Sequence, residues 1–154
     1  MIFVTVGMAY GFNRLVKKMD EISRDINEEI IIQIGDSTFE PKNAKYFRFG
    51  SKEQVNKLYS DARIIVCHSG VGSIITSLEY GKSTIVVPRL KIYGEHIDNH
   101  QIEIAKEFEK RGAVTVIYNI EDLNKTIDTI KSSSFIISKN CELIKNLKTY
   151  LNTL

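Results

Sequence analysis

The residues of this chain that are best suited to chemistry lie in two segments, each directly after a run of apolar residues. The first spans residues 67–73 and reads CHSGVGS. Its glycines let the backbone approach a ligand closely, Ser73 offers a hydroxyl, and the start of the following helix offers unpaired N–H groups and a positive dipole end. We therefore predict a phosphate or diphosphate site at Gly70, Val71, Gly72 and Ser73. A tight turn with a serine cap explains the same residues equally well.

The second segment spans residues 88–101 and is rich in polar side chains. Six of the seven residues from Glu95 to Gln101 are polar. Carboxylates, amides and imidazoles at this density suit a polyhydroxylated ligand, because each of them can donate to a hydroxyl or accept from one. The alternative for Asn99 and Gln101 is that they cap the helix that follows them.

The histidines of the chain leave a second alternative open. All three of them, His68, His96 and His100, lie in these two segments. A spacing of four places His96 and His100 on one face of a helix, where Glu95 would complete a metal site. The neighbouring amides are poor zinc ligands, so we expect no metal and favour the polyhydroxylated ligand.

Two common nucleotide motifs are absent from the sequence. The dinucleotide fingerprint GxGxxG should follow the first strand, where residues 7–11 read GMAYG. No GK[ST] follows a glycine-rich run, as a P-loop requires. Nicotinamide chemistry is therefore disfavoured, and we expect no cofactor.

Apolar runs alternate with stretches of helical periodicity along the chain. Six runs rich in Ile and Val predict strands that are covered on both faces: residues 2–6, 29–34, 45–49, 63–67, 83–87 and 113–117. Five apolar stripes predict helices: residues 12–26, 55–62, 71–78, 97–108 and 123–130. This alternation predicts an α/β fold with a doubly wound parallel sheet of about six strands. Such sheets bind ligands at the carboxyl ends of their strands, where both polar segments lie.

Composition narrows the class of protein. The chain has 154 residues, 43% of them apolar, which suits one domain with its own core. Lys and Arg total 21 against 19 Asp and Glu, so we expect no nucleic-acid partner. Cys67 and Cys141 lie far apart without CxxC spacing, which predicts neither a disulfide nor a zinc site and fits a reducing cytosol. We also expect no membrane span, because no run of about 18 apolar residues occurs, and no signal peptide.

The last part of the chain follows a serine-rich patch at residues 131–134. Spacings of three and four then continue to the end of the chain, at Ile137, Cys141, Ile144, Leu147, Leu151 and Leu154. We divide the chain accordingly into an α/β domain at residues 1–134 and a C-terminal helix at residues 135–154. The stripe either packs on the chain's own sheet or docks on another protein.

The two polar segments together resemble the C-terminal domain of glycosyltransferase family 28. The likeness is carried by HSGVGS at residues 68–73 with Gly81, by Pro88, and by NHQ at residues 99–101. It covers residues 1–120 and is nearest to the stand-alone, donor-binding subunits of two-component transferases. These include the small subunit of the dolichol-pathway GlcNAc transferase and the PssE-like subunits of bacterial polysaccharide synthesis.

The resemblance implies half of a GT-B glycosyltransferase with Rossmann-like topology and assigns roles within it. The donor diphosphate would contact Gly70, Val71, Gly72 and Ser73. The donor sugar would contact Asn99, His100 and Gln101, with Glu95 close by. The nucleobase would lie near Phe49, Gly50 and Ser51. Thr76 stands where many relatives place a ribose-binding Glu, and Glu79, one helical turn further on, is the candidate to replace it.

The resemblance also implies a function and a partner. The chain would be the UDP-sugar-binding catalytic subunit that moves GlcNAc, Gal or a similar sugar onto a lipid-linked acceptor, without a cofactor. A membrane-anchored subunit would bind that acceptor and recruit this cytoplasmic chain to the inner face of the membrane. His68 and His96 are the candidates for the general base, which the partner supplies otherwise. The alternatives are a non-catalytic module that binds a nucleotide-sugar and a free-standing UDP-sugar epimerase.

Overall fold

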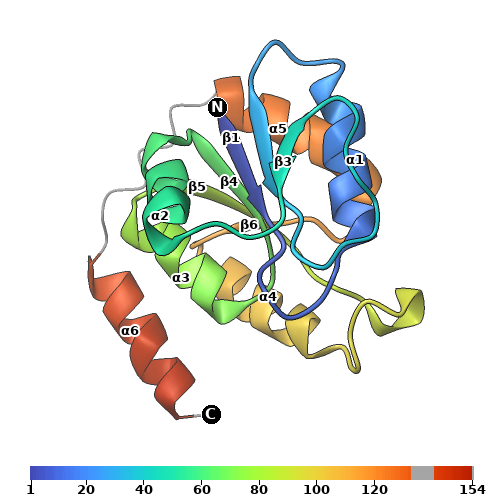
Figure 1. Ribbon diagram of the computed structural model, residues 1–154. Coiled ribbons are helices and arrows are strands. Elements are labelled where there is room, and N and C mark those ends of the chain that lie inside the picture. Colours follow the sequence, from blue (N-terminus) through green and yellow to red (C-terminus); the bar gives the residue numbers. More distant parts are fainter. Residues whose placement is uncertain (133–140, 154) are drawn as a thin grey trace.

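A parallel sheet of six strands forms the middle layer of the protein (Figure 1). The computed structural model describes residues 1–132 and 141–153. The strands run in the order β3-β2-β1-β4-β5-β6. Their bounds are β1 Ile2–Thr5, β2 Ile30–Gln33, β3 Lys45–Phe47, β4 Ile64–His68, β5 Ser83–Val87 and β6 Thr115–Val116. This topology confirms the predicted doubly wound α/β fold.

Helices form where the apolar stripes predict them. Their bounds are α1 Asn13–Ser23, α2 Lys52–Asp61, α3 Val71–Glu79, α4 His100–Lys110, α5 Leu123–Ser132 and α6 Cys141–Asn152, with short 3-10 turns η1 Lys91–Tyr93 and η2 Ile120–Asp122. Ile97 was predicted to open the stripe of α4, which is wrong, because its side chain is exposed and the helix begins at His100. The Asp98 carboxylate accepts the N–H of His100 and marks this start.

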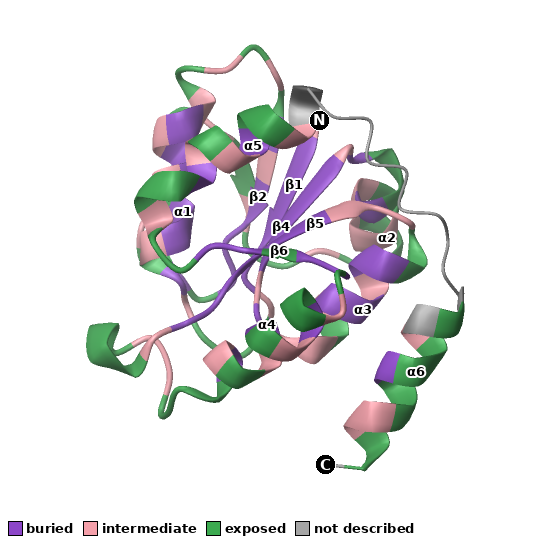
Figure 2. Cartoon of the chain, turned by 180° about the vertical axis from the view of Figure 1, so that it is seen from behind, coloured by how far each residue is buried: buried purple, intermediate pink, exposed green. Residues whose placement is uncertain are grey.

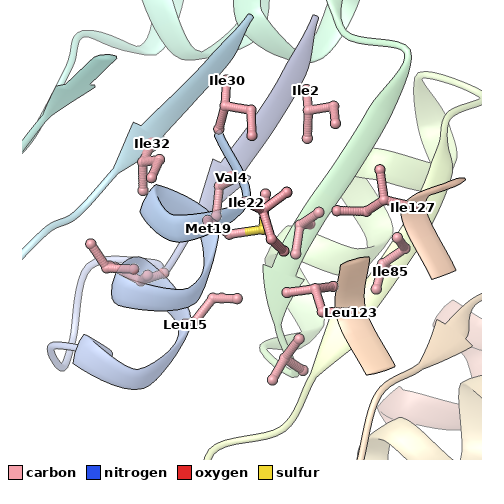
Figure 3. Packing of buried hydrophobic residues seen from close by; sticks show 14 of the residues in the cluster. Ile2, Val4, Leu15, Met19, Ile22, Ile30, Ile32, Ile85, Leu123 and Ile127 are labelled. Carbon is pink, nitrogen blue, oxygen red and sulfur yellow. The ribbon is translucent and has the colours of Figure 1, made fainter. Parts of the chain in front are cut away.

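The helices cover both faces of the sheet, and strands β1, β2, β4 and β5 are buried between them, whereas β3 at one edge is largely exposed (Figures 1 and 2). Successive residues of a strand point to opposite faces. Ile2 and Val4 of β1 therefore join one apolar core with α1 and α5, whereas Phe3 joins a second core with α2, α3 and α4. Figure 3 shows the first core, in which Met19 of α1 and Leu123 of α5 pack towards the sheet. Both faces being apolar explains why the strands read as continuous Ile and Val runs.

The last strand is shorter than its apolar run. The run at residues 113–117 predicted five strand residues, but only Thr115–Val116 pair with β5. The backbone N–H of Ala113 instead donates to the carbonyl of Phe108, and Gly112 has a φ of 68°. Ala113 and Gly112 thus close the carboxyl end of α4 in the manner of a Schellman turn, which shortens β6.

The C-terminal helix α6 lies against the second core. Leu147 is fully buried there, and Ile144 and Leu151 are half-buried against the same cluster. This part of the predicted stripe therefore faces the chain's own domain. The rest of that prediction lies outside the described residues: the boundary at residues 134 and 135, Ile137, the side chain of Cys141, and Leu154.

Candidate functional site

A pocket opens at the carboxyl ends of β1 and β2, beside the first turns of α2 and α3. Its volume is about 420 Å³, within the range of about 300–1,000 Å³ that is usual for small-molecule sites. Strands β2 and β3 lie on one side of β1, and strands β4, β5 and β6 lie on the other side. The strand order therefore reverses at β1, and the pocket lies at this topological switch point. Its lining residues are Thr5, Gly7, Met8, Gln33, Phe49, Gly50, Lys52, Val55, Asn56, Tyr59, Gly72, Ser73 and Thr76.

This pocket brings together two segments that are separate in the sequence. Gly72 and Ser73 come from the predicted diphosphate segment, and Thr76 is the predicted ribose position. Phe49 and Gly50 come from the predicted nucleobase segment and line the same pocket. The predicted diphosphate, ribose and base positions thus share one cavity.

The first turn of α3 supplies unpaired backbone donors to this pocket. Gly70 is the N-cap and its position has no side-chain cap, while the first intrahelical bond runs from the N–H of Ile74 to the carbonyl of Gly70. The N–H groups of residues 71–73 have no such acceptor within the helix. A Cβ added at Gly72 would meet nothing within 4 Å. The backbone at Gly72 is therefore open to a ligand, and the helix dipole favours an anion there.

Gly70 is a glycine for a different reason. A Cβ at Gly70 would lie 2.1 Å from Cε1 of His68, and one at Gly7 would lie 2.5 Å from Nε2 of the same ring. The imidazole of His68 is thus wedged between the two glycines. Of the two glycines in the predicted anion segment, only Gly72 is left open for a ligand, and Gly70 makes room for a side chain. Val71 is half-buried and packs against the second core.

The surroundings of His68 contradict its prediction as a general base. Its Nδ1 lies 2.8 Å from Nη1 of Arg89 and 3.4 Å from Nε2 of Gln101, both of which are donors. Burial lowers the pKa of His68 to about 3, and the positive charges of Arg89 and His96 act in the same direction. Nδ1 therefore already accepts hydrogen bonds from two donors, and it does not take up a proton near neutral pH.

Arg89 is the functional-site residue that sequence reasoning missed. It is 1% exposed although it carries a charge. Its Nη2 donates to the carbonyls of Val6 and Tyr10 at 2.6 and 2.7 Å, and its guanidinium lies 5.2 Å from the centre of the Phe12 ring. Burial lowers the pKa of Arg89 to about 10, which leaves it charged at pH 7. The only signal in the sequence was a basic residue directly after an apolar strand and a proline.

The structure contradicts the prediction of a sugar contact at Gln101. This side chain is 6% exposed, and its Oε1 accepts the backbone N–H of Arg89 at 3.0 Å. Its backbone carbonyl accepts from Oγ of Ser69 at 2.7 Å. Gln101 therefore holds the start of α4 against the two loops, and its side-chain amide contacts its own chain at both Oε1 and Nε2. The alternative that it caps α4 is wrong for the same reason.

The other predicted sugar contacts also bind within the chain. Glu95 pairs with Arg14 through two bonds of 2.8 and 3.2 Å. Oδ1 of Asn99 accepts the N–H of Lys91, so Asn99 does not cap α4 with its side chain. His100 is exposed on the first turn of α4. None of these residues lines the pocket at Gly72.

The residues of the metal alternative have separate partners in the structure. His96 lies before α4 and its Nδ1 is 3.0 Å from a carboxylate oxygen of Asp98, whereas His100 lies in the helix 3.4 Å from Glu103. Glu95 is held by Arg14. Across residues 1–132 and 141–153, no three His, Cys, Asp or Glu side chains converge as a metal would require.

The remaining predicted positions divide in the same way. Thr76 lines the pocket, and its hydroxyl donates to the carbonyl of Gly72 at 2.8 Å. Glu79 lies outside the pocket and forms an ion pair with Lys148 of α6, so the structure gives no support to a ribose contact by this carboxylate. Ser51 forms a capping box with Gln54 at the start of α2.

Sequence reasoning also missed four polar residues that line the pocket. Lys52 and Asn56 lie on the first two turns of α2. Thr5 and Gln33 end neighbouring strands, and the hydroxyl of Thr5 donates to Oε1 of Gln33 at 2.8 Å. Lys52 adds a positive charge to the lining of the pocket. Thr5 and Gln33 lie in stretches that resemble the family, but the sequence indicated no binding role for any of the four residues.

A family model for the glycosyltransferase family 28 C-terminal domain matches residues 1–147. The chain belongs to this family. It is 31% identical to the UDP-N-acetylglucosamine transferase subunit ALG13 of Candida albicans over 134 residues, which are 80% of this chain and 44% of that protein. It is 30% identical to the mouse subunit of the same name over 71% of this chain and 10% of that protein. The chain thus spans less than half the length of these relatives.

Solved structures of glycosyltransferases share the fold. The solution structure of ALG13 has a TM-score of 0.58 and 21% identity, over 86% of this chain and 85% of that one. The glycosyltransferase of kitacinnamycin has a TM-score of 0.70 and 17% identity, over 96% of this chain and 39% of that one. Within the described residues, no helix combines the length and the apolar character needed to cross a bilayer.

Proposed function

We propose that this chain binds UDP-N-acetylglucosamine and is the donor-binding, catalytic subunit of a two-component glycosyltransferase in glycan synthesis. One observation carries the proposal. Gly72 and Ser73, at the start of a helix with unpaired N–H groups, line the same cavity as Phe49 and Gly50. A diphosphate, a ribose and a base need such a continuous site. The names of the ALG13 relatives supply the identity of the base and the sugar. In this proposal the UDP-sugar is a substrate and no cofactor is assigned.

The pocket suggests how the chain would assist transfer. When the bond between the sugar and the diphosphate breaks, negative charge develops on the leaving diphosphate. The N–H groups of residues 71–73 are fixed by the helix before the reaction, so they stabilise that charge without reorganising. Lys52, on the facing helix α2, adds a positive charge on the other side of the pocket. These groups accelerate transfer because they bind the departing anion more strongly than the intact donor.

The proton of the acceptor hydroxyl needs a separate base. His68 is excluded by its buried partners, which leaves His96 in this chain. Nδ1 of His96 contacts Asp98, 3.0 Å from its carboxylate and 3.5 Å from its backbone N–H, so Nε2 is the ring nitrogen left for an acceptor hydroxyl. We assign the base to His96 or to a residue of the partner. Transfer by a complex that carries His96→Gln decides between the two.

The partner in this proposal is a membrane-anchored subunit that binds a lipid-linked acceptor at the cytoplasmic face of the membrane. The chain supplies one α/β domain, whereas GT-B chemistry takes place between two such domains. The apolar residues of α6 that the structure describes face their own domain. A partner that docks on α6 therefore contacts its exposed side, which carries Glu142, Lys145 and Asn146.

Calorimetric titration of the chain with UDP, UDP-N-acetylglucosamine and ADP tests the proposal. We expect both uridine ligands to bind and ADP to bind at least tenfold more weakly. Equal binding of ADP and UDP would remove the uridine assignment. If none of the three ligands binds, the donor-site assignment is overturned.

A matched pair of lysine variants tests the pocket itself. Lys52→Met removes the charge that lines the pocket and should weaken UDP binding about fivefold, as expected of an exposed charge contact of about 1 kcal/mol. Lys57→Met lies on the same helix outside the pocket, where Lys57 pairs with Asp61, and should leave UDP binding unchanged. Transfer by the reconstituted complex separates a catalytic subunit from a non-catalytic module: in a catalytic subunit, Lys52→Met slows transfer at saturating donor.

A further inference from the structure

The hydrogen-bond network around His68 fixes which ring nitrogen carries the proton. An arginine guanidinium has donors only, so Nδ1 of His68 must accept from Nη1 of Arg89. Gln101 points to the same conclusion. Its Oε1 accepts the backbone N–H of Arg89, which turns its NH₂ group towards Nδ1 of His68. With two donors facing Nδ1, the neutral ring carries its proton on Nε2.

This tautomer determines what Ser73 offers to a ligand. Nε2 of His68 lies 3.3 Å from Oγ of Ser73, so the ring donates and the serine oxygen accepts. The hydroxyl proton of Ser73 is then left for the pocket that this residue lines, where the hydroxyl of Tyr59, which also hydrogen-bonds with Ser73, is its other possible acceptor. In the opposite tautomer, Ser73 would donate its proton to Nε2 and would present only lone pairs to the pocket. An anion is attracted by the first arrangement and repelled by the second.

Arg89 is held firmly enough to impose this choice. It is 1% exposed, and Nη2 donates to the carbonyls of Val6 and Tyr10 in the loop after β1. The ring of His68 cannot turn away, because Gly7 and Gly70 lie in van der Waals contact with its two sides. Arg89 itself does not line the pocket.

We propose that Arg89 is a positioning residue that acts through His68 and makes the Ser73 hydroxyl a hydrogen-bond donor to the diphosphate of the bound nucleotide. The identity of the ligand rests on the proposed function, whereas the tautomer of His68 does not. Ser73 touches the ligand, and Arg89 and His68 determine the direction of its hydrogen bond.

Nitrogen NMR of the ligand-free chain tests the tautomer. Protonated and unprotonated ring nitrogens give well-separated ¹⁵N signals, so the two tautomers are distinguished directly. We expect His68 to show a protonated Nε2 and a bare Nδ1 across the neutral pH range. A proton on Nδ1 would overturn the proposal whatever the chain binds. In Arg89→Met, where Gln101 alone still faces Nδ1, the share of the Nε2-protonated tautomer should fall, a change that a purely structural role of Arg89 does not require.

A double-mutant cycle on UDP affinity tests the effect on the ligand. Ser73→Ala should weaken UDP binding about tenfold in the native background, the effect of losing one charge-assisted hydrogen bond. In the Arg89→Met background the same change should alter UDP binding by less than twofold. Equal losses in the two backgrounds would show that Ser73 acts independently of Arg89 and would overturn the proposal. Uridine, which lacks the phosphates, should bind equally well with and without the Ser73 hydroxyl.

Two further variants guard against a trivial result. Arg63→Met removes an arginine that pairs with Glu28 at the amino ends of the strands, away from the pocket. It should leave both the His68 signals and the Ser73 effect unchanged. If Arg89→Met does not fold, Arg89→Lys replaces it, because one ammonium nitrogen cannot occupy both the position of Nη1 beside His68 and the position of Nη2 beside the carbonyls of Val6 and Tyr10. If native chain binds no UDP, the proposed function fails and the diphosphate role of Ser73 fails with it, whereas the NMR result still decides the tautomer.

Discussion

The start of α3 and the segment at residues 88–101 lie at the same edge of the sheet, and both are rich in groups that bind ligands. At the start of α3, backbone N–H groups have no acceptor within the helix and Gly72 faces open space. In residues 88–101, by contrast, Glu95 is paired with Arg14, Asn99 with the backbone of Lys91, and Gln101 with the backbone of Arg89.

This difference shows that polar density and availability are separate properties. A loop that leaves a buried strand must satisfy its own backbone and side chains, and a segment rich in Asp, Asn and Gln does so internally. The start of α3 does not, because its N-cap is Gly70, which has no side chain to accept from the first N–H groups. The first segment is therefore the better candidate for a ligand, and the second is the better candidate for the scaffold that positions it.

The two glycines of the anion segment give the largest expected contrast. Gly70→Ala should destabilise the fold by about 3 kcal/mol, because its Cβ would overlap the His68 ring in a packed site. The backbone at Gly70 has a φ of −83°, which alanine adopts without strain, so the ring alone is responsible. Gly72→Ala should leave the free energy of unfolding nearly unchanged. Urea unfolding of both variants measures the difference, and equal stabilities would contradict it.

The buried imidazole of His68 should also make the free energy of unfolding depend on pH. The pKa of His68 falls from 6.5 to about 3 on folding, so between these values the unfolded chain binds a proton that the folded chain does not. Stability therefore falls as the pH drops from 6.5, by at most about 1.4 kcal/mol per pH unit.

Unfolding measured at pH 7 and pH 5 should show a loss of about 2 kcal/mol from this one group. His68→Gln should remove that part of the pH dependence, whereas His100→Gln, at an exposed position, should keep it. An unchanged slope in His68→Gln would show that the ring is protonated in the folded chain.

Gln101 distinguishes a scaffold from a sugar site. Gln101→Met should lower the free energy of unfolding by about 2 kcal/mol, because it leaves the buried N–H of Arg89 without an acceptor. The affinities for UDP and for UDP-N-acetylglucosamine should change together and by less than threefold. A selective loss of the sugar nucleotide, with unchanged stability, would instead restore Gln101 as a sugar contact.

At Gly72, where the backbone is open to a ligand, an added side chain should block binding without destabilising the fold. Gly72→Val should weaken UDP binding about tenfold, or by about 1.4 kcal/mol, because its methyl groups would occupy the approach to the α3 N–H groups. The melting temperature should stay within a degree or two of the native value, since no atom lies within 4 Å of the added Cβ. Unchanged affinity in calorimetric titration would place the diphosphate elsewhere.

The smallest expected effect is a gain. Thr76→Glu introduces the carboxylate that many relatives of this family are expected to carry at this position of the pocket. UDP should bind a few-fold more tightly, while 2′-deoxy-UDP should gain less because it lacks one ribose hydroxyl. Thr76→Gln, of similar size but uncharged, is the matched control. Weaker binding by the glutamate variant would place the phosphates, rather than the ribose, next to residue 76.

The fold could be predicted from the sequence because its signal is repeated along the chain. The Ile- and Val-rich runs of β1, β2, β4 and β5 are buried on both faces, as Ile2, Phe3 and Val4 show, and such runs have few alternatives. The prediction of burial on both faces is wrong for residues 45–49, which contain neither Ile nor Val and include the exposed edge strand β3. The resemblance to the family assigned Phe49 and Gly72 to one nucleotide site, and both residues line the same pocket.

The internal partners of the site could not be predicted. The burial of Arg89 depends on the carbonyls of Val6 and Tyr10, which another loop brings to it. Nothing near Arg89 in the sequence encodes that loop. The pairing of Glu95 with Arg14 likewise joins residues 81 positions apart. A sequence does not show which polar groups already form hydrogen bonds with each other. The density of polar side chains at residues 95–101 therefore indicated a ligand.

The wedge of His68 between two glycines has a consequence for how related sequences change. Position 70 carries glycine to accommodate the imidazole, since its backbone conformation suits any residue. A relative in which a small residue replaces His68 is therefore released from glycine at position 70, and it also loses the acceptor that faces Arg89. Positions 68, 70 and 89 should accordingly be substituted together, whereas position 72 should follow the ligand alone. A search pattern that treats Gly70 and Gly72 as one signature would therefore combine two separate constraints, the His68 ring at position 70 and the ligand at position 72.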